Sequence, residues 1–279
     1  MSDLTKLDRP EILRVLFHPR REPPGKPPVG AEDINIRVAD GVTVGTRFFS
    51  ANLQAPTILF FHGNGETVPD YDDIGPIFTS LDINFLIADY RGYGWSDGSP
   101  SASALIRDGR TILETLSGRL KQAGYSGKLF VMGRSMGSAP AIDLAAGHAD
   151  MLAGLIIESG FADTVPLART LGIDLPAMGI TEEDGFNNAR RIEQVMIPTL
   201  ILHGARDSLI PLWHAEKLHA ACGARSKELQ VIPGADHNSV MAVAGMLYFQ
   251  AIKGYVDRVT GAADWRRKRR HFKKQDQLP

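Results

Sequence analysis

Residues 128–138, KLFVMGRSMGS, place a serine between two glycines directly after a short apolar run. A strand that turns sharply into a helix through a G-x-S-x-G sequence exposes the serine hydroxyl, and the glycines allow close backbone approach. The motif alone is a weak signal, because glycines punctuate turns in many proteins. Whether Ser135 is a nucleophile therefore depends on whether the rest of the chain supplies a base, an acid and an oxyanion site.

Short apolar runs like this one recur along the chain and alternate with stretches of helical periodicity. They are rich in β-branched or aromatic residues and do not alternate with polar ones, which is typical of strands buried on both faces. They lie at 57–63, 84–90, 128–133, 152–160, 198–204 and 229–234. The intervening pattern predicts helices at 101–122 and near 71–81, 136–147, 211–221 and 238–257. This alternation predicts an α/β fold with a mostly parallel, doubly wound sheet.

Two segments depart from this alternation. Residues 34–49 have Asp40-Gly41 at their centre and predict an antiparallel N-terminal hairpin at one edge of the sheet. The connection between the strands near 158 and 199 spans about 40 residues, far more than a simple crossover needs, and predicts a small cap insertion at about 161–190. We expect the following division of the chain: an N-terminal lead-in over 1–31, extended and proline-rich at 21–30, one domain over 32–258, and a C-terminal tail over 259–279.

The composition is that of an ordinary globular protein of 279 residues, with 43% hydrophobic and 23% charged residues. The single cysteine, Cys222, cannot form an internal disulfide, which favours a reducing compartment. The N-terminus carries charges throughout and does not resemble a secretory signal. No stretch reaches the roughly 20 apolar residues that span a bilayer. These features predict a soluble, cytoplasmic protein.

The net charge of −1 conceals a strongly basic C-terminal tail. Residues 265–279, WRRKRRHFKKQDQLP, hold seven Lys or Arg and one Asp. Such a run is usually a solvated end, and an anionic membrane surface is the alternative partner. Nucleic acid is disfavoured as a partner, because no nucleic-acid-binding fold accompanies the run. The sequence does not indicate an oligomeric state.

Polar residues follow the predicted parallel strands where each one ends. Ser135, Asp207 and His237 each follow a different strand. Because the carboxyl ends of parallel strands share one edge of the sheet, these three residues should converge. Serine is a poor nucleophile at neutral pH and needs a base to take its proton and an acid to orient that base. We therefore predict Ser135 as the nucleophile, His237 as the base and Asp207 as the acid.

A tetrahedral intermediate also needs preorganised N–H donors for its oxygen. One donor should be the backbone N–H of Met136, directly after the nucleophile. The second should come from Asn64-Gly65, in the loop after the first parallel strand.

Other residues compete for these roles. Asp236 is adjacent to His237 and would point away from it, whereas Glu158 follows the strand after the serine strand, where some hydrolases keep their acid. His62 and His203 each precede a glycine at a strand end, and we interpret both as imidazoles that stabilise turns.

Three further residues are candidates for the substrate pocket, each with a structural alternative. Arg134 either braces the turn through a buried salt bridge or anchors an anionic group of the substrate. Tyr93 and Trp95 either line the pocket or pack within their own loop.

We expect no metal site, because no His or carboxylate pairs show helical ligand spacing. A phosphate-binding or dinucleotide-binding glycine motif is also missing from the sequence.

The segments FFHGNGE, ADYRGYGWSDGSPS, GRSMGS, PTLILHGARDSLIP and GADHN resemble the α/β-hydrolase superfamily over residues 32–258. They look like intracellular serine hydrolases that include acyl-protein thioesterase-like and membrane-associated esterase members. The resemblance implies a triad of Ser135, Asp207 and His237, an oxyanion segment at 62–65, no cofactor, and hydrolysis of an ester, thioester or amide. The cap shows no matching motif, so the resemblance does not identify the substrate.

We therefore predict a serine hydrolase that cleaves a carboxylic ester or acyl thioester through an acyl-enzyme intermediate. Its substrate would be a small molecule or an acylated partner. A serine peptidase of the same fold is one alternative. A catalytically silent hydrolase fold that acts as a binding protein is another.

Overall fold

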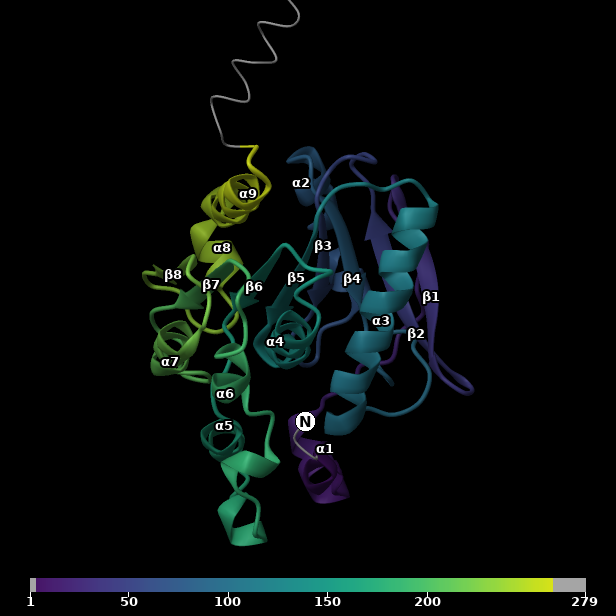
Figure 1. Ribbon diagram of the computed structural model, residues 1–279. Helices are drawn as coiled ribbons and strands as arrows, with labels where there is room; N and C mark the ends of the chain where they lie inside the picture. The colour runs from purple at the N-terminus through teal and green to yellow at the C-terminus, as the bar shows by residue number, and fades with distance from the viewer. Residues whose placement is uncertain (1–3, 263–279) are drawn as a thin grey trace, which may run out of the picture.

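One eight-stranded sheet runs through the molecule (Figure 1), in a computed structural model that describes residues 4–262. The strands are β1 Ala31–Ala39, β2 Val42–Phe49, β3 Thr57–Phe61, β4 Asn84–Ala88, β5 Leu129–Arg134, β6 Gly154–Glu158, β7 Thr199–Gly204 and β8 Lys227–Ile232. Their order across the sheet is β1-β2-β4-β3-β5-β6-β7-β8. β2 pairs antiparallel with both β1 and β4, and every other neighbouring pair is parallel. The predicted parallel sheet with an antiparallel N-terminal hairpin is confirmed.

Helices cover both faces of this sheet. They are α1 Pro10–Leu16, α2 Gly75–Ser80, α3 Ala102–Gln122, α4 Ser138–Gly147, α5 Thr164–Thr170, α6 Asn188–Ile192, α7 Trp213–Ala221, α8 Val240–Ala244 and α9 Met246–Thr260. Buried residues of α1, α3, α4 and α7 form one hydrophobic cluster, and those of α2, α8 and α9 form another. No helix within residues 4–262 combines the length and the apolarity needed to cross a bilayer.

The central strands β3 to β7 are buried and mostly apolar because they contribute to both clusters. In β3, Leu59 and Phe61 pack in the cluster with α3 and α4, whereas Ile58 and Phe60 pack in the cluster with α2 and α9. Successive side chains of a strand point to opposite faces, so a strand covered on both sides needs an unbroken apolar run. This requirement explains the non-alternating runs in the sequence.

The segment predicted as one helix near 238–257 forms two helices. α8 ends at Ala244, and α9 begins at Met246. Between them Gly245 has a φ of 55°, which a helix cannot contain and which glycine adopts without steric cost. The helical periodicity continues across this break, so the pattern alone did not reveal it.

The N-terminal segment, residues 4–18, contains more structure than the predicted lead-in. A 3-10 helix, η1 (Leu4–Asp8), precedes α1, and Leu7 and Ile12 are fully buried in the core. α1 has only seven residues, which is too few for a helix to be stable or recognisable without tertiary packing. The basic run at 265–279 lies outside the described residues.

The long connection between β6 and β7 contains α5 and α6 and two 3-10 helices, η4 (Pro176–Met178) and η5 (Glu182–Asp184). We call residues 161–190 of this connection the cap segment. The cap segment and α1 lie at the same end of the molecule (Figure 1). Arg191 of α6, directly after the cap segment, forms a partly buried ion pair with Asp143 of α4 and holds the end of the cap segment in place.

Candidate active site

The predicted residues lie at the edge of the sheet where the parallel strands end. Ser135 follows β5, Asp207 follows β7 and His237 follows β8, as the element bounds require. The three side chains form one hydrogen-bonded chain. Ser135 Oγ lies 2.9 Å from His237 Nε2, and His237 Nδ1 lies 2.8 Å from Asp207 Oδ2. The structure thus brings together three residues that are separated by up to 102 positions in the sequence.

Ser135 occupies a sharp turn between β5 and α4. Its φ is 50°, an uncommon backbone conformation for a residue with a side chain. The turn is also tightly packed. A Cβ at Gly133 would lie 2.1 Å from the carbonyl oxygen of Gly137, and a Cβ at Gly137 would lie 2.1 Å from the carbonyl oxygen of Phe61. The two glycines of the motif are therefore required by backbone contacts, and the strained turn presents the serine hydroxyl to the histidine.

Asp207 is held in a fixed orientation relative to His237. Its Oδ1 accepts hydrogen bonds from the backbone N–H groups of Leu209 (3.0 Å) and Ile210 (2.8 Å), which leaves Oδ2 facing the imidazole. An acid that accepts from Nδ1–H keeps Nε2 unprotonated and able to accept the serine proton.

The rival acids do not contact the His237 imidazole. Asp236 Oδ1 accepts from the backbone N–H of Asn238 (3.0 Å) and from the Ser239 hydroxyl (2.6 Å), within its own turn. Glu158 is buried, and its Oε2 accepts from the Tyr248 hydroxyl at 2.5 Å. Burial raises the pKa of Glu158, while Arg134 and Tyr248 counteract that effect.

A second histidine, His203, supports the loop that carries Asp207. Its Nε2 lies 2.8 Å from the carbonyl oxygen of Ile210 and 3.5 Å from Asp207 Oδ2. Burial lowers the pKa of His203, so the imidazole is neutral and donates to the carbonyl. This arrangement agrees with its interpretation as a residue that stabilises a turn.

The side chain of Asn64 is fully engaged in structural hydrogen bonds. Its Oδ1 accepts from the Tyr93 hydroxyl (2.6 Å) and from the backbone N–H of His18 (2.9 Å), and its Nδ2 donates to the carbonyl of Leu16 (3.0 Å). These bonds fix the loop after β3 beside Ser135. Any oxyanion donor from Asn64 or Gly65 must therefore be a backbone N–H. Met136 follows Ser135 at the start of η3 (Ser135–Gly137), where a helix leaves its first N–H groups unpaired.

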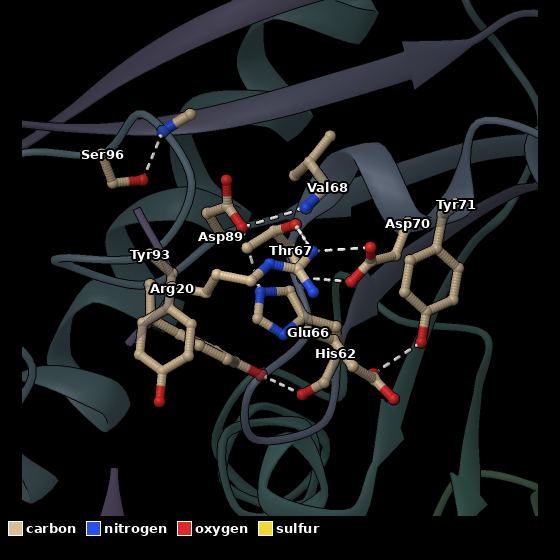
Figure 2. Close-up of polar contacts among 12 residues, drawn as sticks. Arg20, His62, Glu66, Thr67, Val68, Asp70, Tyr71, Asp89, Tyr93 and Ser96 are labelled. Carbon is tan, nitrogen blue, oxygen red and sulfur yellow. Dashed lines mark hydrogen bonds and ion pairs between the residues drawn. The ribbon is translucent and has the colours of Figure 1, made fainter. Parts of the chain in front are cut away.

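The rest of the loop after β3 is anchored by a polar network (Figure 2). Asp89 Oδ1 lies 3.1 Å from His62 Nε2 and accepts from the backbone N–H of Val68 at 3.1 Å. Glu66 accepts from the Tyr71 hydroxyl at 2.8 Å and from the backbone N–H of Gly63 at 2.7 Å. His62 thus serves the structural role that the sequence indicated, and Asp89 is its partner. Their contacts hold the loop in place against the sheet.

Arg134 is a brace between the loops that surround Ser135. Its guanidinium contacts Glu66, lies 3.3 Å from Glu158, and donates to the carbonyl of His237 and to Oδ1 of Asn238, both at 3.1 Å. Burial lowers the pKa of this guanidinium, but the carboxylates of Glu158 and Glu66 outweigh the effect and raise it. The structure therefore favours the bracing interpretation over an anchor for an anionic substrate.

An apolar pocket opens beside Ser135. It contains about 460 Å³ of unfilled space, part of it open to solvent. The residues that line it are Leu16, Phe17, Asn64, Ser135, Met136, Phe161, Leu167, Leu171, Phe186 and Leu209. None of them carries a charge. The lining comes from three places: the N-terminal segment, the cap segment and the loops at the strand ends.

Tyr93 and Trp95 are not among the lining residues. The Tyr93 ring is buried and its hydroxyl supports Asn64, as described above. Trp95 packs on Gly45 and Arg47 of the N-terminal hairpin, and its Nε1 donates to Asn35 at 3.0 Å. Both aromatic residues thus have structural contacts with other segments of the chain, and their candidate role in the pocket is not supported.

Comparison with known proteins places this chain in a family. A model of the prolyl oligopeptidase family matches residues 118–263, and a model described as serine aminopeptidase, S33, matches residues 54–172. Protein bem46 of Schizosaccharomyces pombe is 32% identical over 233 residues, which cover 81% of this chain and 76% of that protein. The α/β-hydrolase domain-containing protein WAV2 of Arabidopsis thaliana is 27% identical over 236 residues, 78% of this chain and 76% of its own. The chain belongs to the α/β-hydrolase family.

Solved structures share the fold of this α/β-hydrolase. The Pyrococcus furiosus esterase Pf2001 superposes with a TM-score of 0.71 at 15% identity, covering 87% of this chain and 98% of that one. A soluble variant of monoglyceride lipase from Saccharomyces cerevisiae superposes with a TM-score of 0.68 at 19% identity, covering 85% of this chain and 98% of that one. At such identities the likeness establishes the fold alone. The family and the fold support hydrolase activity, and the site itself must indicate the bond that is cleaved.

Two groups of residues at this site were not found from the sequence. Leu16 and Phe17 line the pocket from a segment that showed no recognisable pattern. Glu66 and Glu158 are the partners of Arg134. No spacing rule relates Glu66 to Arg134, because the two lie on separate loops, and Glu158 was considered from the sequence only as a rival acid. Within residues 4–262, no group of three or more His, Cys, Asp or Glu residues is placed to hold a metal ion.

Proposed function

We propose that this α/β-hydrolase cleaves carboxylic esters or acyl thioesters through an acyl-enzyme intermediate on Ser135. The observation that carries the proposal is the hydrogen-bonded chain from Ser135 Oγ through His237 to Asp207, at 2.9 Å and 2.8 Å. Both contacts lie within the range at which a base can accept the proton of a nucleophile.

In the first half of the reaction, Ser135 Oγ attacks the acyl carbon while its proton moves to His237 Nε2. The carbonyl oxygen becomes an anion that the backbone N–H of Met136 and an N–H of the Asn64-Gly65 loop stabilise, each contributing roughly 3 kcal/mol. The imidazolium keeps its Nδ1–H bonded to Asp207. It then gives its Nε2 proton to the departing alcohol or thiol as the bond to the acyl carbon breaks.

In the second half, water replaces the leaving group. His237 takes a proton from this water as the oxygen attacks the acyl carbon. The second tetrahedral intermediate collapses, the bond between the acyl group and Ser135 Oγ breaks, and the serine recovers its proton from His237. The carboxylic acid is then released.

Peptide hydrolysis is a second candidate, because both matching family models are named for peptidases. The uncharged lining of the pocket favours esters over the aminopeptidase reaction, since the substrate of an aminopeptidase carries a charged amine. A charge buried without a partner costs several kcal/mol. Amino-acid amides with a free amine should therefore be hydrolysed far more slowly than short p-nitrophenyl esters.

The test of the proposed function is Ser135→Ala. Turnover of p-nitrophenyl esters should fall by at least about a thousandfold, because the nucleophile is removed. A fluorophosphonate probe should label the wild type at Ser135, and His237→Ala should prevent that labelling. Normal turnover by folded Ser135→Ala would refute the assignment. No labelling of folded wild type would favour a catalytically silent binding protein.

A further inference from the structure

The N-terminal segment, residues 4–18, connects the cap segment to the loop that carries Asn64. At one end, Lys6 Nζ lies 2.7 Å from Asp184 Oδ1, and Arg9 donates to the carbonyl of Met178 at 3.2 Å. Asp184 and Met178 belong to the two 3-10 helices of the cap segment. At this end the segment is thus tied to the cap.

The other end of the segment is tied to the loop beside Ser135. The Leu16 carbonyl and the His18 N–H both bond to the side chain of Asn64, at 3.0 Å and 2.9 Å. The Asn64 amide also lies 2.9 Å from His18 Nδ1. The segment therefore bridges two parts of the site that are far apart in the sequence.

Leu16 and Phe17 lie at the end of this bridge and face the pocket at Ser135. They are 7% and 4% exposed, and both line the pocket together with residues of the cap segment. Side chains that only stabilise the core need no free volume beside them. Here the two side chains border unfilled space that also contacts the serine, which indicates a surface for substrate.

The acyl group is the part of an ester that suits an enclosed pocket. It stays bonded to Ser135 between the two halves of the reaction, whereas the alcohol has to leave after the first. A space walled by the N-terminal segment and the cap segment can retain the acyl chain without blocking release of the alcohol. The lining offers apolar contacts and no charged partner.

We propose that Leu16 and Phe17 form the acyl-binding wall of this enzyme and select uncharged, apolar acyl groups by chain length. The N-terminal segment is then a specificity element of the active site. The proposal rests on the proposed function, since it assumes an acyl-enzyme at Ser135. To the proposed function it adds the class of acyl group that is accepted and the two residues that determine this preference.

The test compares p-nitrophenyl esters that differ only in the acyl chain, from acetate through butyrate and octanoate to laurate. Phe17→Ala enlarges the pocket and should move the optimum to longer chains, and Leu16→Phe narrows it and should move the optimum to shorter ones. A methylene that gains or loses its contact changes kcat/KM by roughly tenfold or more. Phe17→Leu is a milder variant that preserves folding if Phe17→Ala does not. Leu13→Ala, in α1 but outside the pocket lining, is the matched control and should leave the optimum unchanged.

Charge provides an independent test. The hemisuccinate ester places a carboxylate where the butyrate ester has a methyl group, and its kcat/KM should be at least about tenfold lower. The proposal would be overturned if both pocket variants kept the wild-type optimum of acyl-chain length. It would also be overturned if the variants changed only the preference among acetates of different alcohols, because the pocket would then bind the alcohol. Hydrolysis of the hemisuccinate ester as fast as the butyrate ester would overturn the apolar selectivity.

Failure of this inference can be distinguished from failure of the proposed function. Fluorophosphonate labelling of Ser135 reports on the nucleophile and does not depend on the acyl preference. If Ser135 is labelled in both pocket variants but their chain-length optimum is unchanged, the serine hydrolase assignment stands. Only the proposed role of Leu16 and Phe17 would then be refuted.

Discussion

The guanidinium of Arg134 donates a hydrogen bond to the backbone carbonyl of His237 at 3.1 Å. The residue before the proposed nucleophile thus holds the loop that carries the proposed base. The same guanidinium contacts Glu66, whose Oε2 accepts from the N–H of Gly63. One buried cation therefore connects the serine turn, the histidine loop and the loop after β3. The relative positions of these three loops determine the distance from Ser135 to His237.

Arg134→Lys should lower kcat by roughly ten- to a hundredfold with a smaller effect on KM, because a small misplacement of catalytic groups has effects of this size. Lysine keeps the charge but lacks the planar fork that reaches several acceptors at once. Steady-state kinetics and the rate of fluorophosphonate labelling measure the effect. Arg37→Lys, at an exposed ion pair with Asp40, is the control. Unchanged kcat in folded Arg134→Lys would contradict the positioning role.

Asp207→Asn should preserve the fold and lower kcat by about ten-thousandfold. The N–H groups of Leu209 and Ile210 would hold the amide oxygen of the asparagine, so its NH₂ would face His237 Nδ1. The imidazole would then carry its proton on Nε2 and could not accept the serine proton. Kinetics at neutral pH measure the loss. Asp236→Asn, beside the same histidine, keeps an acceptor oxygen for its turn and should change kcat little, and an equal loss there would refute the assignment of the acid.

Gly137→Ala should destabilise the protein by roughly 1–3 kcal/mol or more, the range observed when a packed site receives extra atoms. The new Cβ would lie 2.1 Å from the carbonyl oxygen of Phe61, which belongs to the central strand β3. Urea unfolding measures the change in the free energy of unfolding. Gly147→Ala, at the other end of α4, meets no atom within 4 Å. It should be neutral or stabilise the helix by up to about 1 kcal/mol, and equal losses in both variants would contradict the argument.

His214 should make the stability depend on pH in the acid range. Burial lowers its pKa from 6.5 to about 4, and its Nδ1 accepts from the backbone N–H of Ala162 at 3.1 Å. Between these values the unfolded chain binds a proton that the folded protein does not. The free energy of unfolding should therefore fall by up to about 3 kcal/mol as the pH drops from about 6.5 to about 4.

His214→Asn removes the titrating group and keeps an acceptor for Ala162. Urea unfolding between pH 4 and 7 should show a smaller loss of stability in this variant than in the wild type. His219→Asn, a change at a partly exposed position of the same helix, should keep the wild-type dependence. Identical slopes for His214→Asn and the wild type would exclude His214 as the source.

The hydrophobic pattern of the sequence was sufficient to predict those strands and helices whose residue types are determined by burial. Strands covered on both faces need apolar runs, so β3 to β7 could be predicted from the sequence. The edge strand β8 was found by the same pattern although it is only partly buried. The long helix predicted at 101–122 is α3, Ala102–Gln122, capped by the Ser101 hydroxyl. The pattern failed where structure depends on one backbone angle, as at Gly245, or on tertiary packing, as in α1.

The sequence by itself determined the α/β fold and the residues that follow each parallel strand, because parallel strands bring their carboxyl ends to one edge whatever the details of packing. Ser135, Asp207 and His237 could therefore be nominated together. Only the tertiary structure decided that Arg134 braces the site, that Trp95 packs away from it, and that Leu16 and Phe17 line the pocket. These contacts join segments with no periodic relation in the sequence, and their distances depend on how side chains pack in the folded chain.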